Sequence, residues 1–392
     1  MHSSTRRRVA VSLWIDHPYP QHQEVYEGVQ RYAAERPDWE LIIDEHPAYK
    51  RRAAAAAVRY DGVIARAEKP LQQRLKRAKI PLVNVYYSER RPGVVGVYPD
   101  PQAMGRLAAD HLIDRAFQRL FVLADRKRSY WWDVSRAIAN RANEAGVTCE
   151  TLEPPQQPYH PPSHWSKVVG FLDALLDRIE RPAAVISESV PGARILIQQA
   201  IARSWRVPQD LAVMCMHDFG AILHMPPALT SVVPNYQRCG YEAAAVLDRL
   251  MKGESPPPEP IYIPPRGIMA RQSTDYFAVE DEVVAAALHY ISSRLREDLR
   301  LPDIAEAVLV SRRTLQTRFA EALGRSVTDE IRRLRLEAAK RMIAQRNRPI
   351  QEVAVECGFR NSRNLCQVFQ RELGMSPRAF ASDDVPFTKK IG

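Results

Sequence analysis

Two stretches near the end of the chain decide the fold of its last quarter: SRRTLQTRF, residues 311–319, and NSRNLCQVF, residues 361–369. Each opens on a small polar residue, which is typical of the first position before a helix. Leu and Phe then follow four positions apart, at 315 and 319 and again at 365 and 369. This spacing places both side chains on one face of a helix. The chain therefore contains the same helical unit twice.

A shorter helical pattern precedes each of these stretches. It reads LPDIAEAVLV over residues 301–310 and IQEVAVEC over residues 350–357. Ser311 and Asn361 are the expected N-caps of the helices that follow, and Gly358 suits a left-handed turn. A short helix, a tight turn and a second helix make a helix-turn-helix, in which the second helix enters the major groove of DNA.

With Leu and Phe in the core, the polar side chains of both second helices point outward. Arg suits guanine, whereas Gln and Asn suit adenine, so this set can read base edges. The alternative is the solvated face of an ordinary helical bundle; two copies in register on a basic segment favour DNA. The candidate DNA-binding residues are Arg312, Arg313, Gln316, Thr317, Arg363, Asn364 and Gln367.

Charge supports a polyanionic partner for this part of the chain. The 392 residues carry a formal net charge of +10. Between Arg312 and Arg378 there are 15 lysines and arginines against 7 aspartates and glutamates, so most of the excess lies there. Between the two units, VTDEIRRLRLEAAKRMIAQ reads as one helix of roughly 28 Å. Such a rod can place two recognition helices about one DNA turn, ~34 Å, apart.

The first 270 residues have a different pattern. Short apolar runs such as VAVSLWI, DGVIA, RLFVLA, AAVIS and LAVMCM alternate with helical stretches. This alternation predicts doubly wound parallel sheets, which bind ligands at the carboxyl ends of their strands. We expect a small-molecule-binding domain over residues 1–278, an all-α DNA-binding domain with two helix-turn-helix units over 279–382, and a tail over 383–392.

The segment from about Val283 to Phe380 resembles the AraC-type DNA-binding domain. The resemblance rests on IQEVAVECGFRNSRNLCQVFQRELGMSPRAF, with RLRLEAAKRMI as the central helix. By position it implies base contacts by Arg313 and Thr317 in the first unit and by Arg363 and Gln367 in the second. Leu309 departs from the family, which usually has a turn glycine there. If that position needs a positive φ, leucine is strained and the first turn differs in shape.

The N-terminal part resembles the effector domain of LacI-type regulators, which is itself similar to periplasmic sugar-binding proteins. The matching segments are DGVIARAEKPLQQRLKRAKIPLVNVYY, VYPDPQAMGRLAADHLI, RVPQDLAVMCMHDFG and PPALTSVV followed by GYEAAAVLDRLMKG. The resemblance implies a two-lobed sensor with a sugar effector, a homodimer, a DNA operator and an activator that acts through RNA polymerase. A repressor output and a different effector are the alternatives.

The resemblance assigns a sugar-hydroxyl contact to Arg136 and a stacking wall to Trp132. The candidate ligand set is Asp16, His22, Trp132, Arg136, Ser189 and His217. Ser189, His217 and Pro234 replace polar contacts usual in the family, so the effector can differ. The two adjacent tryptophans, 131 and 132, are otherwise ordinary core residues, because buried aromatic side chains are common. Asp100 is interpreted as a helix N-cap.

Other classes of protein fit the sequence less well. The chain lacks GxGxxG after a strand, a P-loop, GxSxG and HExxH, so an enzyme is not expected, nor is a cofactor. HPPSH cannot form a regular helix that aligns its histidines, so no metal site is expected. The run after RRR ends at Asp16-His17 and reads as a first buried strand, so a secreted solute-binding receptor is disfavoured. Five scattered cysteines and no long apolar run indicate the cytoplasm and no membrane span.

Overall fold

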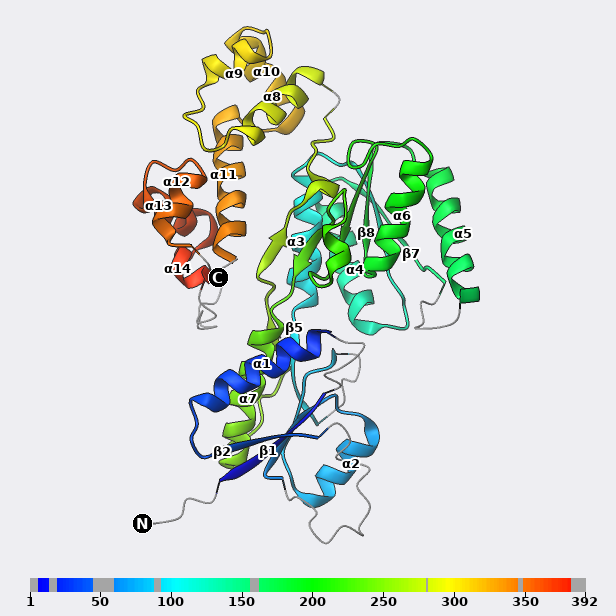
Figure 1. The fold of residues 1–392 in the computed structure, drawn as a ribbon, viewed down its shortest axis with the longest axis vertical. Helices are drawn as coiled ribbons and strands as arrows, with labels where there is room; N and C mark the ends of the chain where they lie inside the picture. The colour runs from blue at the N-terminus through cyan, green and yellow to red at the C-terminus, as the bar shows by residue number, and fades with distance from the viewer. Residues whose placement is uncertain are drawn as a thin grey trace. The chain divides into compact units, whose positions relative to one another are not determined.

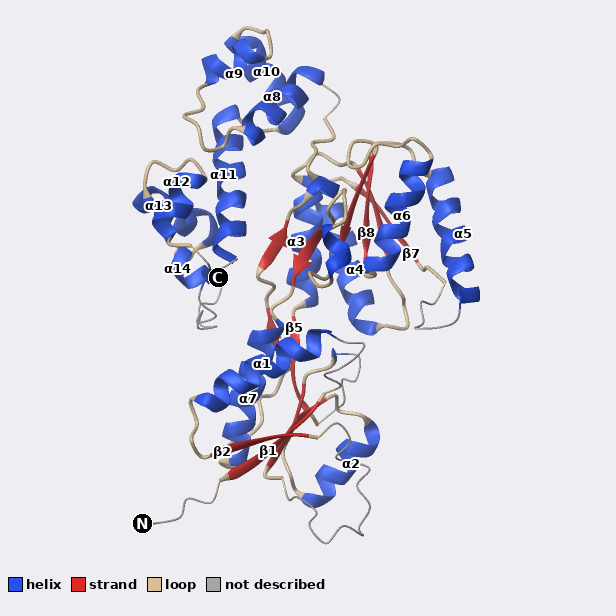
Figure 2. Ribbon diagram, in the orientation of Figure 1, coloured by secondary structure: helices blue, strands red, loops and turns tan. Residues whose placement is uncertain are grey.

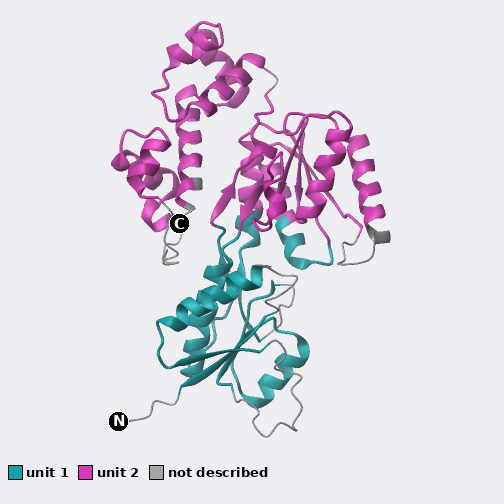
Figure 3. Cartoon of the chain, viewed as in Figure 1, with its two compact units in different colours: residues 1–104, 126–134, 234–265 teal, residues 105–125, 135–233, 266–392 magenta. Residues whose placement is uncertain are grey.

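The computed structural model describes residues 6–13, 20–44, 60–87, 93–155, 162–279, 281–344 and 348–381. By its internal contacts the chain divides into two units (Figure 3). The first consists of residues 1–104, 126–134 and 234–265, and the second of residues 105–125, 135–233 and 266–392. The chain passes between them five times, and two of these passages lie within helices, α3 (Pro101–Ile113) and α4 (Ser129–Glu144).

The first unit contains a six-stranded sheet in the order β11-β5-β4-β3-β1-β2, and its strands pair in parallel (Figure 2). The strands are β1 (Arg7–Ser12), β2 (Trp39–Ile43), β3 (Gly62–Ala65), β4 (Leu82–Asn84), β5 (Val95–Pro99) and β11 (Ile261–Ile263). The helices are α1 (Pro20–Ala34), α2 (Lys69–Ala78) and α7 (Tyr236–Met251).

Alternation along β1 explains how both faces of this sheet are covered. Val9 and Val11 pack with α1 and α7 on one face, whereas Ala10 packs with α2 on the other. Helices α1 and α7 approach so closely that a Cβ on Gly28 would lie 1.9 Å from the carbonyl oxygen of Gln237, and one on Gly240 would lie 1.9 Å from that of Val25. Glycine is required at both positions, because any side chain would separate the helices.

The second unit contains another six-stranded sheet, in the order β12-β10-β9-β8-β6-β7. Its strands are β6 (Arg119–Leu123), β7 (Thr148–Leu152), β8 (Ala183–Ser187), β9 (Leu211–Cys215), β10 (Thr230–Val233) and β12 (Gly267–Met269). All pairs are parallel except β10 with β12. Helices α5 (Pro162–Arg178) and α6 (Val190–Ala202) cover one face through Leu172 and Leu196. Both alternating sets of β8 are fully buried, as a doubly wound sheet requires.

The remainder of the second unit is helical among its described residues (Figure 1). Its helices are α8 (Glu282–Ser293), α9 (Leu301–Ala307), α10 (Arg312–Leu323), α11 (Val327–Ala344), α12 (Ile350–Glu356), α13 (Ser362–Leu373) and α14 (Pro377–Ala381). The predicted fold class, two parallel-sheet lobes followed by a helical region, is therefore confirmed.

Two hydrophobic cores share the long helix α11. Ile331 and Leu334, in its first half, pack with α8, α9 and α10. Leu336 and Ile343, in its second half, pack with α12, α13 and α14. Each predicted helix-turn-helix unit thus has its own core. Helix α11, which links them, is continuous over its 18 residues, about 27 Å.

Candidate nucleic-acid interface

The two predicted recognition helices begin where the sequence places them. The Ser311 hydroxyl accepts a hydrogen bond from the Thr314 N–H at 3.1 Å, and the Asn361 Oδ1 accepts one from the Asn364 N–H at 2.9 Å. Gly324 and Gly374 end these helices in the left-handed conformation. The expected N-caps are therefore confirmed in both units.

The apolar stripe and the polar face separate in the same way in both helices. Leu315 and Phe319 are fully buried, and so are Leu365 and Phe369. The predicted DNA-binding residues lie on the opposite side: Arg312, Arg313, Gln316, Thr317, Arg363 and Gln367 are exposed, and Asn364 is half-buried.

Arg313 and Arg363, which are predicted to contact bases, differ from Arg318 in their ion pairing. Arg318, on the same helix, lies 3.5 Å from a carboxylate oxygen of Asp281. Arg313 and Arg363 form no ion pair with any of the residues that the structure describes. Their guanidinium groups are thus available to a guanine or a phosphate without breaking an existing pair.

The turn of each unit is closed by equivalent hydrogen bonds. Leu309 N–H donates to the Glu306 carbonyl at 3.0 Å, and Gly358 N–H donates to that of Val355 at 3.0 Å. Leu309 has φ +57° and Gly358 has φ +73°. The expectation that a leucine at a positive φ would change the shape of the first turn is not met, because the backbone keeps the left-handed conformation.

The candidate ligand residues lie in both of the compact units described above, not in the helix-turn-helix units. Asp16 lies outside the described residues. His22 is buried on α1, and its ring centroid lies 6.1 Å from that of Tyr86. Trp132 lies on α4 with the Arg126 guanidinium 4.5 Å from its ring centroid, and Arg136 is exposed one turn later. Trp131 is buried beside Tyr130.

Ser189 and His217 follow two adjacent parallel strands, β8 and β9, and so lie at one edge of the second sheet. The Ser189 hydroxyl accepts a hydrogen bond from the Gly192 N–H at 3.1 Å, and it caps α6. The His217 ring packs against Phe219, with centroids 4.7 Å apart. Pro234, which follows β10, is buried.

Sequence reasoning missed the residue beside His217. The Asp218 Oδ1 accepts hydrogen bonds at 2.6 Å from both the Arg271 guanidinium and the Ser231 hydroxyl. Arg271 also donates to the Leu229 carbonyl at 2.9 Å. This carboxylate therefore ties the segment after β12 to the start of β10. The sequence signal for this contact is an arginine, Arg271, shortly after the last strand of the sensor.

Asp100 behaves as the predicted N-cap. Its Oδ1 accepts hydrogen bonds from the N–H groups of Gln102 at 2.8 Å and Ala103 at 3.0 Å. The Asp100 carboxylate therefore caps α3 through hydrogen bonds within the first turn of that helix.

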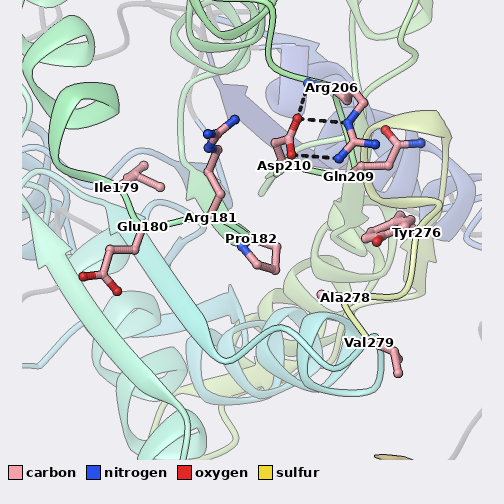
Figure 4. Close-up of a pocket in the computed structure, with 10 residues that line it drawn as sticks. All are labelled: Ile179, Glu180, Arg181, Pro182, Arg206, Gln209, Asp210, Tyr276, Ala278 and Val279. Carbon is pink, nitrogen blue, oxygen red and sulfur yellow. Dashed lines mark hydrogen bonds and ion pairs between the residues drawn. The ribbon is translucent and has the colours of Figure 1, made fainter. Parts of the chain in front are cut away.

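A pocket of about 810 Å³ lies at the opposite, amino edge of the second sheet (Figure 4). None of the candidate ligand residues lines it. Arg206 holds both carboxylate oxygens of Asp210 there at 3.1 Å, and this pairing lowers the pKa of Asp210. The lining residues are Ile179, Glu180, Arg181, Pro182, Arg206, Gln209, Asp210, Tyr276, Ala278 and Val279.

Two further observations concern metal binding and membrane spans. The described residues contain no group of three or more His, Cys, Asp or Glu side chains that could hold a metal ion, and His160 and the side chain of His164 lie outside them. Among the described helices, none is both long and apolar enough to cross a membrane.

Comparison with known proteins matches both parts of the chain. Residues 109–274 match the periplasmic binding protein-like domain, and residues 304–383 match a helix-turn-helix domain. The xylose operon regulatory protein of Escherichia coli K12 is 27% identical over 374 residues, which cover 91% of this chain and 93% of that protein. Its counterpart in Haemophilus influenzae is 24% identical over 91% of this chain and 94% of that protein.

Solved structures agree on the fold. The structure of the xylose-binding transcription activator xylR covers 97% of this chain and 99% of its own, with a TM-score of 0.59 and 24% identity. A regulatory protein of the LacI family from Chloroflexus aggregans covers 68% of this chain and 98% of its own, with a TM-score of 0.56 and 20% identity.

Proposed function

We propose that this chain, a homologue of xylose operon regulatory proteins that joins a periplasmic binding protein-like sensor to an AraC-type helix-turn-helix domain, is a sugar-responsive transcription regulator. The observation that carries the proposal is the pair of capped helices with Arg313 and Arg363 exposed and unpaired among the described residues. No catalytic role is assigned to any residue.

In this proposal residues 1–278 form the sensor and residues 279–382 form the reader, which is the part that binds DNA. The residues 383–392 are a tail outside the described structure. The two helix-turn-helix units contact adjacent half-sites of one operator, and α11 sets their separation. Because both are tethered, binding by one unit raises the effective concentration of the other.

The effector is proposed to be a sugar such as D-xylose, held by the candidate set around Arg136 and His217. The alternative is a different small molecule, because Ser189 is engaged as a helix cap and Pro234 offers no polar side chain. The ligand shifts DNA binding only by its differential affinity for two arrangements of the protein. The proposed regulator is a homodimer in the cytoplasm, where the chromosome lies. It activates transcription through RNA polymerase; repression is the alternative.

The test is binding of the purified chain to the DNA upstream of its own gene, with and without a panel of pentoses and hexoses. Arg313→Ala and Arg363→Ala are each expected to weaken specific binding by about 5–150-fold, the equivalent of one bidentate base contact of about 1–3 kcal/mol. Arg318→Ala is the matched control, since that exposed arginine lies on the same helix but pairs with Asp281.

The outcomes separate the parts of the proposal. Sugar-dependent binding that both variants lose supports the regulator and identifies its effector. Specific binding that no sugar changes retains the reader and rejects the sugar effector. Absence of specific binding at low salt as well would contradict the proposed function.

A further inference from the structure

One residue of the sensor part, Asp114, contacts the reader with both its backbone and its side chain. It follows directly on the last residue of α3. Its carbonyl oxygen accepts a hydrogen bond from the Arg325 guanidinium at 2.9 Å, and its carboxylate accepts one from Arg333 at 3.2 Å. Both arginines belong to the reader: Arg325 precedes α11 and Arg333 lies in its second turn.

The two arginines are held in place by a buried carboxylate on α11. Glu330 is fully buried and accepts hydrogen bonds from Arg325 at 2.5 Å and from Arg333 at 2.7 and 2.9 Å. Burial opposes ionisation of Glu330, but the two arginines outweigh it and lower its pKa. The reader therefore presents a pre-oriented pair of guanidinium groups, and Asp114 is the acceptor that lies across from them.

The next residue, Arg115, fixes the segment that connects the sensor to the reader. Its carbonyl accepts a hydrogen bond from the Ala278 N–H at 2.7 Å. Its buried guanidinium donates to the Thr274 carbonyl at 2.9 Å and to the His111 carbonyl at 3.0 Å. Phe277, between these contacts, packs into the reader's first core. The end of α3 thus holds both the connecting segment and α11.

Burial and pairing act in opposite directions on the Asp114 carboxylate. Burial raises the pKa of Asp114 above its ordinary value, and the attraction of Arg333 and Arg325 does not fully offset this. The gain from pairing with the two arginines is therefore partly offset by the cost of removing these charges from water. Helix α3, of 13 residues, begins in the first unit and ends directly before Asp114 in the second.

We infer that Asp114 is a positioning residue through which the sensor sets the orientation of the reader. Its interaction with Arg325 and Arg333 is the contact that transmits the state of the sensor to α11. This inference rests on the proposed function for its regulatory meaning, whereas the docking contact itself can be tested without DNA or ligand.

The test uses the full chain with Asp114→Ala and a matched control, Asp110→Ala. Both side chains belong to the α3 region, both are 40% exposed and both pair with an arginine. Asp110 pairs with Arg141 of the sensor at 2.6 Å and forms no ion pair with the described residues of the reader, so its loss removes a comparable ion pair without affecting α11.

The first measurement is cleavage by endoproteinase Glu-C, which cuts after glutamate and has a site at Glu282, an exposed residue beside the connecting segment. Without DNA or sugar, Asp114→Ala is expected to be cleaved there at least about fivefold faster than Asp110→Ala, because coupling of 1–3 kcal/mol corresponds to 5–150-fold. Equal cleavage of the two variants would overturn the inference. If Asp114→Ala aggregates, Asp114→Asn, which keeps the shape and removes the charge, is compared in the same assay.

The second measurement is DNA affinity with and without D-xylose. Asp114→Ala is expected to reduce the sugar-induced change in affinity at least about fivefold, while Asp110→Ala retains it. A response in Asp114→Ala equal to that of the control would reject the transmitting role. If D-xylose has no effect on the unmodified chain, the proposed effector fails, and the cleavage assay still decides whether Asp114 docks the reader.

Discussion

Leu309 shows how one residue departs from its environment without changing the fold. Its side chain is 91% exposed, so it contributes little packing, and its backbone occupies the left-handed region at φ +57°. For residues other than glycine this conformation costs roughly 1–2 kcal/mol. Gly358 takes the equivalent position in the second unit at no such cost. The first turn is therefore strained, and the hydrogen bonds around it maintain its conformation.

Leu309→Gly is expected to raise the free energy of unfolding by about 1 kcal/mol, because it removes this strain and loses almost no buried surface. The measurement is the thermal denaturation midpoint of the full chain. Gly358→Ala is the counterpart and should lower the midpoint, since its Cβ would lie 1.9 Å from the Leu295 carbonyl oxygen. A destabilised Leu309→Gly variant would show that the exposed leucine has a packing role.

Among the elements of the first unit, α7 is joined to β1 and to α1 through one buried carboxylate. Asp248 receives hydrogen bonds from Arg7 at 3.2 Å, Tyr32 at 3.0 Å and Lys252 at 2.7 Å. These partners come from β1, α1 and the residue after α7. Burial disfavours the charged form of Asp248, but Lys252 and Tyr32 outweigh it, and its pKa is lowered.

Asp248→Asn is expected to destabilise the first unit by about 2–3 kcal/mol at pH 7, the typical contribution of hydrogen bonds to a charged group. Because the folded pKa lies below the unfolded value of about 3.9, this stabilisation is present above about pH 4 and is lost as pH falls through the folded pKa. Urea denaturation at pH 7 and pH 3 checks this: the difference between variant and unmodified chain should shrink at pH 3. A difference independent of pH would mean that shape, not charge, matters at this position.

The reader contains two hydrophobic cores that share one long helix, α11. Because Leu334 and Leu336 belong to different cores, bending α11 between them would disturb both. The separation of the two recognition helices is therefore set by the protein and not by the DNA. This predicts a strict requirement for half-site spacing.

Inserting about five base pairs between the half-sites places the second on the opposite face of the DNA, and is expected to reduce affinity at least about tenfold. Inserting about ten base pairs restores the face but should not restore affinity, since α11 cannot lengthen. Competition binding with operators of graded spacing measures this. Full recovery at the ten-base-pair insertion would show that the two units move independently.

Much of the fold, and the caps and exposed faces of the candidate DNA interface, could be predicted because they depend on neighbours in the chain. Helix caps at Ser311 and Asn361, the buried stripe through Phe319 and Phe369, and the exposure of Arg313 and Arg363 follow from spacings of three and four residues. Strand alternation likewise indicated the parallel sheets. The ligand set was harder to assign, because its members lie far apart in sequence and belong to two units.

The two sheets, the repeated helical unit and the buried face of each recognition helix could be inferred from the sequence, because hydrophobic periodicity and capping are local. Which distant charges meet became clear from the folded structure. Asp114 pairs with Arg333 across 219 positions, Asp248 with Arg7 across 241, and Asp218 with Arg271 across 53. A carboxylate that pairs locally and one that pairs across the fold look the same in sequence, since their partners are chosen by packing that brings distant elements into contact.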